Sequence, residues 1–228
     1  MRTGSDPGGG QGPRAQVAAL VGRGVAWGIP GRLLDPGARP AAVLVLLGVL
    51  DALPAHHRLA AVPADLDVLL VRRASTLNHH AGQVAFPGGR VDPGDRDVVA
   101  AALREAEEET GLDRTGIEVL GTLDPVPVPV SDHLVTPVLG WWASPSPVGV
   151  VDAAESATVF RAPVADLVDP ANRSNVVLRR AGVSHRSPAF DVAGHVVWGF
   201  TALVLDRLLD ELGWAQPWDQ ERTRPVPL

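Results

Sequence analysis

The chain has 228 residues, a length that fits one domain of about 150 to 200 residues with tails. It contains 46% hydrophobic and 20% charged residues and no cysteine, and all 20 basic residues are arginine. This composition excludes a wholly disordered chain, a disulfide scaffold, a thiolate zinc site and a cysteine or lysine nucleophile. The formal charge of −6 argues against a broad nucleic-acid-binding surface.

The sequence shows neither a membrane span nor a secretory signal. Its most apolar run, residues 41–50, is ten residues long, about half of what a bilayer requires. We therefore expect a cytoplasmic protein without a membrane partner. The Gly- and Pro-rich residues 1–15 predict a flexible tail, residues 16–214 a single domain, and residues 215–228 an irregular C-terminal tail.

Hydrophobic periodicity and turn residues predict a series of short strands and three helices, with a further short helix as an option between Gln16 and Gly31. Strands are expected on both sides of the central helix, which indicates an α/β fold with a mixed sheet and packed helices. In chain order, the predicted elements are strands at 42–47, 68–72 and 84–86, a helix at 96–110, strands at 117–123 and 134–143, a short helix at 162–169, a hairpin of 176–180 with 183–185, and an amphipathic helix at 201–212.

The predicted helix 96–110 carries a costly acidic face. Glu105, Glu108 and Glu109 lie at positions i, i+3 and i+4, where like charges repel by roughly 0.2–0.5 kcal/mol per pair. They also lie near the helix C-terminus, where the helix dipole disfavours anions. A solvated acidic face is one interpretation, and a bound Mg²⁺ or Mn²⁺ ion that compensates the charge is the other.

A resemblance favours the second interpretation. Residues 89–112 resemble the Nudix box, Gly-x5-Glu-x7-Arg-Glu-U-x-Glu-Glu-x-Gly-U, where U is aliphatic. The sequence departs from it in three ways: Asp95 stands for the first Glu, eight residues rather than seven separate Asp95 from Arg104, and Ala106 stands for the first U. The matching residues are Gly89, Arg104, Glu105, Glu108, Glu109, Gly111 and Leu112.

Two further stretches are similar to signatures of the coenzyme A pyrophosphatase branch of this family. One precedes the box and runs from Leu69-Leu70 through Arg73, His80 and Phe86 to Gly89. The other is Trp198-Gly199-Phe200-Thr201-Ala202. The resemblance implies a Nudix-type α/β/α sandwich that cleaves the diphosphate of coenzyme A, or of its acyl derivatives, into 3′,5′-ADP and (acyl-)4′-phosphopantetheine.

The resemblance also implies roles for individual residues. Glu105 and Glu109 would be the main ligands of Mg²⁺ or Mn²⁺, with Glu108 a third, and Arg104 would orient a glutamate. The expected substrate-binding residues are Arg73, His80, Gly88 and Gly89. The general base stays open between Glu108 and Glu155.

Several alternatives stay open. The same chemistry could act on ADP-ribose or on another nucleoside diphosphate derivative, and a silent nucleotide-binding domain or an RNA 5′-end-processing enzyme would share the fold. We expect a small nucleotide diphosphate as the partner, since the negative charge makes a long nucleic acid a poor ligand. A homodimer is left open.

Overall fold

The computed structural model describes residues 12–28, 37–49, 62, 65–75, 81–180 and 183–227. Within them, eight strands form a mixed sheet in which β1 runs parallel to β7 and antiparallel to β2 and β4. The central order is β3-β2-β1-β7-β5, with β4 paired to β1, β6 to β7 and β8 to β2. These strands are β1 (Arg39–Val49), β2 (Leu66–Arg73), β3 (Val84–Ala85), β4 (Gly88–Arg90), β5 (Ile117–Thr122), β6 (Val126–Val128), β7 (His133–Trp142) and β8 (Ser156–Pro163).

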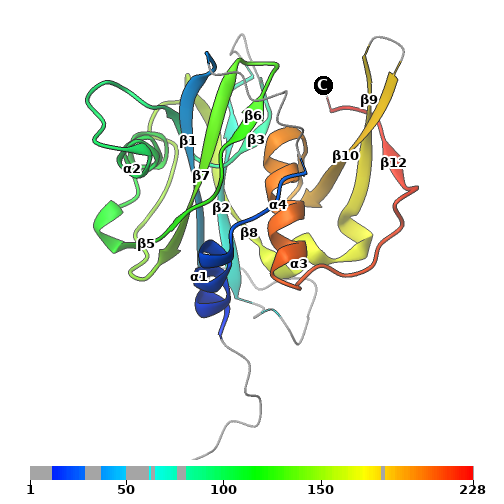
Figure 1. Ribbon diagram of the computed structural model, residues 1–228, viewed down its shortest axis with the longest axis horizontal. Helices are drawn as coiled ribbons and strands as arrows, with labels where there is room; N and C mark the ends of the chain where they lie inside the picture. Colours follow the sequence, from blue (N-terminus) through cyan, green and yellow to red (C-terminus); the bar gives the residue numbers. More distant parts are fainter. Residues whose placement is uncertain are drawn as a thin grey trace, which may run out of the picture.

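Helices cover both faces of this sheet. Helix α2 (Val98–Thr110) lies on one face, and α1 (Pro13–Arg23) and α4 (Gly199–Glu211) lie on the other (Figure 1). Strand β1 is apolar on both faces because it is central: Leu44 belongs to the core under α2, whereas Val45 belongs to the core under α1 and α4. The predicted α/β/α sandwich with a mixed sheet is therefore confirmed.

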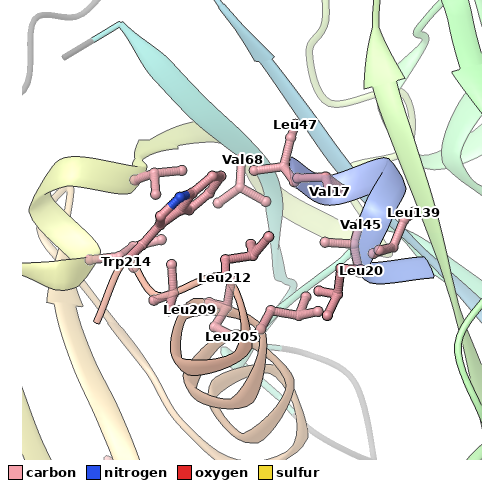
Figure 2. A pocket seen from close by; sticks show the side chains of 13 residues that line it. Val17, Leu20, Val45, Leu47, Val68, Leu139, Leu205, Leu209, Leu212 and Trp214 are labelled. Atoms are coloured by element: carbon pink, nitrogen blue, oxygen red, sulfur yellow. The ribbon is translucent and has the colours of Figure 1, made fainter. Parts of the chain in front are cut away.

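The core between the sheet and α4 holds a small apolar cavity. Figure 2 shows Val45 and Leu47 of β1 facing Leu205 and Leu209 of α4 across it, with Val17 of α1 at its edge. Its volume is about 20 Å³ and no polar group lines it. Because a buried water needs polar partners, this space is a packing defect of the core rather than a site for chemistry.

A second sheet lies beyond α4 (Figure 1). Buried Arg173 links it to the rest of the protein: its guanidinium lies 4.5 Å from the ring centroid of Phe190 and 4.8 Å from that of Trp218, and it forms an ion pair with Asp206 of α4. The sheet contains β9 (Arg173–Arg180), β10 (Val183–Val192), β11 (His195–Val197) and β12 (Thr223–Arg224), and the remaining short helices are η2 (Arg114–Gly116), α3 (Val164–Val168) and η3 (Pro170–Asn172).

Most predicted elements are present, with ends that shift by a few residues. The central helix begins at Val98 rather than at residue 96, because the Asp97 side chain accepts a hydrogen bond from the backbone N–H of Ala100 and caps the helix. It ends where predicted, at Gly111, which adopts a left-handed conformation with φ 69°. Among the described residues, no helix is both long and apolar enough to span a bilayer.

Three expectations were wrong. Strand β8 was not predicted, and it pairs with β2 along most of its length. Helix α1 begins at Pro13, inside the predicted N-terminal tail, because proline suits the first turn of a helix. The C-terminal tail is not irregular throughout: Thr223–Arg224 form β12 beside β9, where Asn175 binds the backbone of the neighbouring residues 220 and 222.

Asp67 is a buried acid whose carboxylate oxygens have no hydrogen-bond partner among the residues that the structure describes. Burial raises the pKa of its carboxyl to about 7, against the opposing charge of Arg161. The folded protein therefore holds this proton more tightly than the unfolded chain does. The protonated Asp67 therefore contributes to the free energy of unfolding in full below pH about 4, and this contribution is lost as the pH rises through about 7.

We predict that Asp67→Asn melts at least about 3 °C above the parent protein at pH 8, and that this difference disappears near pH 4. Thermal melts from pH 4 to 8 measure it. Glu107→Gln, at a half-exposed site, is the control and should show no such pH dependence. A constant difference between Asp67→Asn and the parent at every pH would contradict the assignment.

Candidate active site

The acidic face of α2 packs against the glycine backbone of β4. The backbone N–H of Gly88 donates a hydrogen bond of 3.0 Å to a carboxylate oxygen of Glu109. The neighbouring Gly89 lies so close to Glu105 that a Cβ there would be 2.4 Å from its carboxyl carbon. Glycine at these two positions thus lets a strand approach two carboxylates that are one helical turn apart.

Arg104 holds the acidic groups of this helix together. Its guanidinium donates two hydrogen bonds of 3.0 Å to the two carboxylate oxygens of Asp95. It also binds Glu105 at 3.1 Å and Glu108 at 2.9 Å, and donates to the backbone carbonyl of Arg90 at 3.1 Å. One cation therefore offsets the repulsion among three carboxylates and fixes their orientation.

Asp95 is the site residue that the sequence did not reveal. It was a departure from the Nudix box, and the structure makes it the bidentate partner of Arg104 with a side chain only 6% exposed. Its hydrogen bond from Arg104 holds the pKa of Asp95 below its ordinary value. The signal was present, because Asp95 is acidic and stands at the position of the first Glu when the box is counted from Gly89.

Glu109 is the most buried of the three glutamates, with 8% of its side chain exposed. Burial raises its pKa to about 7, and the charges of Glu105 and Glu155 add to the shift. The Gly88 N–H and the charge of Arg73 oppose it, the Arg73 guanidinium lying 3.9 Å from the carboxylate. Burial also raises the pKa of Glu105, while Arg104 lowers it. Both carboxylates are thus poorly compensated.

The donor set fits a hard divalent cation. Within the described residues, no three acidic or histidine side chains converge on one point that could hold a metal ion. Glu105 and Glu109 instead offer two carboxylates on one helix face, next to a glycine backbone. Two carboxylates with waters and phosphate oxygens as the remaining ligands suit Mg²⁺, which keeps several waters when bound.

The other predicted site residues lie at different places. Arg73, Gly88 and Gly89 are brought to Glu105 and Glu109. Glu108 is turned outward, with 59% of its side chain exposed, and binds Arg104. Glu155 is exposed, and its backbone carbonyl accepts a hydrogen bond from Ala74, the residue after Arg73. His80 lies outside the described residues.

Comparison with known proteins agrees with this geometry. The family model described as "NUDIX domain" matches residues 56–138. "Uncharacterized Nudix hydrolase NudL" of Photorhabdus laumondii is 37% identical over 148 residues, which cover 64% of this chain and 76% of that protein. The protein of the same name in Shigella flexneri serotype 5b is 39% identical over 166 residues, which cover 70% and 85%. The chain belongs to the Nudix hydrolase family.

A solved structure shows the same fold. The Nudix hydrolase RenU of M. smegmatis superimposes with a TM-score of 0.51 and 20% identity, over 82% of this chain and 92% of that one. As a Nudix hydrolase, the present protein is an enzyme that acts on diphosphate bonds. Enzymes of this family generally require divalent metal ions, which agrees with the donor set of α2.

Replacing Gly88 or Gly89 by alanine should have different effects on this Nudix hydrolase. The three atoms nearest to a Cβ at Gly89 all belong to the Glu105 carboxyl group, which can rotate away, so Gly89→Ala should fold normally but lower diphosphate hydrolysis at least about tenfold. A Cβ at Gly88, where φ is +152°, would lie 2.3 Å from the backbone oxygen of Ala42, so Gly88→Ala should lower the melting temperature.

Gly94→Ala is the matched control, because a Cβ there meets no atom within 4 Å. Thermal melts and steady-state rates of the three variants measure the effects. Equal activity of Gly89→Ala and Gly94→Ala would contradict the close approach of β4 to Glu105.

Proposed function

We propose that the enzyme hydrolyses the diphosphate bond of coenzyme A or its acyl derivatives, giving 3′,5′-ADP and (acyl-)4′-phosphopantetheine. The observation that carries the proposal is that the Nudix box contacts the first of the two stretches similar to the coenzyme A pyrophosphatase branch, which in turn contacts the second. Glu109 of the box contacts Gly88 and Arg73 of the preceding stretch. Thr201 of the third stretch donates a hydrogen bond of 3.0 Å to the carbonyl of Val84, at the start of the β3–β4 segment.

In this proposal Glu105 and Glu109 hold Mg²⁺ or Mn²⁺, and Glu108 contributes as a third ligand, directly or through water. The metal ion would neutralise charge on the diphosphate and lower the pKa of the attacking water. Arg104 is a positioning residue, since its guanidinium already donates to Asp95, Glu105, Glu108 and the carbonyl of Arg90. It keeps Glu105 and Glu108 oriented before substrate arrives.

Arg73 is proposed to bind the diphosphate. Its side chain is one-third exposed and lies 3.9 Å from Glu109. Its Nε is buried without a hydrogen-bond partner among the described residues. An arginine held beside the carboxylates in this way can bind a phosphate oxygen on one side and Glu109 on the other. Gly88 and Gly89 leave room for that oxygen, and we also assign His80 to substrate binding on the resemblance.

Two glutamates are candidates for the general base. Glu108 is next to Glu109 on α2 and accepts a hydrogen bond from Arg104. Glu155 is exposed, and its charge reaches Glu109 from outside α2. The base is the residue whose replacement by Gln removes the ascending limb of the pH–rate profile of kcat.

Product analysis tests the substrate. Coenzyme A incubated with the enzyme and Mg²⁺ or Mn²⁺ should yield 3′,5′-ADP and 4′-phosphopantetheine, with a kcat/KM at least about tenfold above that for ADP-ribose. Chromatography of the products in parallel reactions measures both rates. Faster turnover of ADP-ribose would contradict the proposal and would favour ADP-ribose as the substrate. Binding of both compounds without products would indicate a silent domain.

Glu109→Gln should lower turnover at least about a hundredfold, because it removes a metal ligand. The fold should persist, since the new amide can still accept the Gly88 N–H and no longer buries a charge. Glu107→Gln, on the same helix and paired with exposed Arg114, is the control and should keep its activity. An active Glu109→Gln variant would count against the metal site.

A further inference from the structure

Two arginine side chains and a histidine come together on the face of the sheet that is turned away from α2. Arg39 of β1 is the direct partner of His133 of β7, so their side chains share one face. Arg90 of β4 pairs with Ala41, two residues after Arg39 and therefore on the same face. A Cβ at Gly89 would face Glu105 of α2. Because successive residues of a strand face opposite sides of the sheet, the side chain of Arg90 lies on the side away from α2.

The three groups are within electrostatic range of one another. The charges of Arg39 and Arg90 both add to burial in lowering the pKa of the His133 imidazole. Exposed Asp132 opposes them with a smaller effect. Neither arginine has an ion-pair partner in the described part of the chain; Arg39 donates to the backbone carbonyl of Ser131 at 2.8 Å. Two like charges gathered beside a single exposed acid are costly unless an anion compensates them.

The trio, Arg39, Arg90 and His133, is joined to the active site through β4. Residues 88 and 89 of that strand contact Glu109 and Glu105, and the carbonyl of residue 90 is held by Arg104. Within the described residues β4 pairs only with β1, so its other edge has no strand beside it. A substrate whose diphosphate lies at the two glycines can therefore pass around this edge toward the trio.

We propose that Arg39, Arg90 and His133 form a subsite for a phosphomonoester of the substrate, separate from the diphosphate that is cleaved. Two guanidinium groups and an imidazole suit a phosphate dianion, because guanidinium groups donate paired hydrogen bonds to its oxygens. Under the proposed function, on which this inference rests, that group is the 3′-phosphate of coenzyme A. ADP-ribose has no such phosphate, so the subsite would select between the two substrates.

The first test compares coenzyme A with 3′-dephospho-coenzyme A. Arg39→Gln and Arg90→Gln should each lower the ratio of their kcat/KM values about tenfold. Arg114→Gln is the matched control, because it removes the same charge from η2, where Arg114 pairs with Glu107. It should leave the ratio unchanged. A ratio that stays constant in both subsite variants overturns the proposal.

The second test does not depend on turnover. Without metal, calorimetry should show that the parent protein binds 3′,5′-ADP at least about tenfold more tightly than 5′-AMP, and that Arg39→Gln and Arg90→Gln remove the difference. Equal affinities in the parent protein overturn the subsite. If the difference is present but coenzyme A is not hydrolysed, the proposed function fails and the subsite stands.

Discussion

The site depends on the Arg104 guanidinium, which lies among carboxylates that would otherwise repel one another. It binds Asp95 with two hydrogen bonds and reaches Glu105 and Glu108 from the same side. Glu109 alone is left to the Gly88 N–H and to Arg73. Arg104 therefore compensates Asp95, Glu105 and Glu108, and the buried Glu109 beside the glycine backbone is left with the least positive charge.

The fold could be predicted where local patterns decide it. The apolar run in β1 and the cap and stop residues of α2 indicated the central strand and helix, because burial on both faces and helix capping leave clear signals. Strand β8 could not be found in this way. It ends in Pro163, its burial does not alternate, and it is fixed by pairing with β2 some ninety residues earlier in the chain. Strand β12 likewise needs β9 as a partner.

The same distinction holds for the candidate site, where features set within one helix could be predicted and contacts between elements could not. Spacing on one helix placed Glu105, Glu108 and Glu109 on one face, and the glycines before it indicated a close backbone approach. The sequence could not show that Glu108 turns outward to Arg104 while Glu109 is buried, because that difference depends on how α2 packs on β4. Nor could it bring Arg39, Arg90 and His133 together, since their neighbourhood follows from the register of three strands.

The central claim is that Glu105 and Glu109 share a divalent cation beside β4. Anomalous diffraction from crystals soaked in Mn²⁺ with a non-cleavable diphosphate analogue tests it most directly. The account predicts one strong anomalous peak within about 2.5 Å of oxygens from both carboxylates, with phosphate oxygens completing the coordination. Clear density for the analogue with no anomalous peak at these two side chains would contradict it.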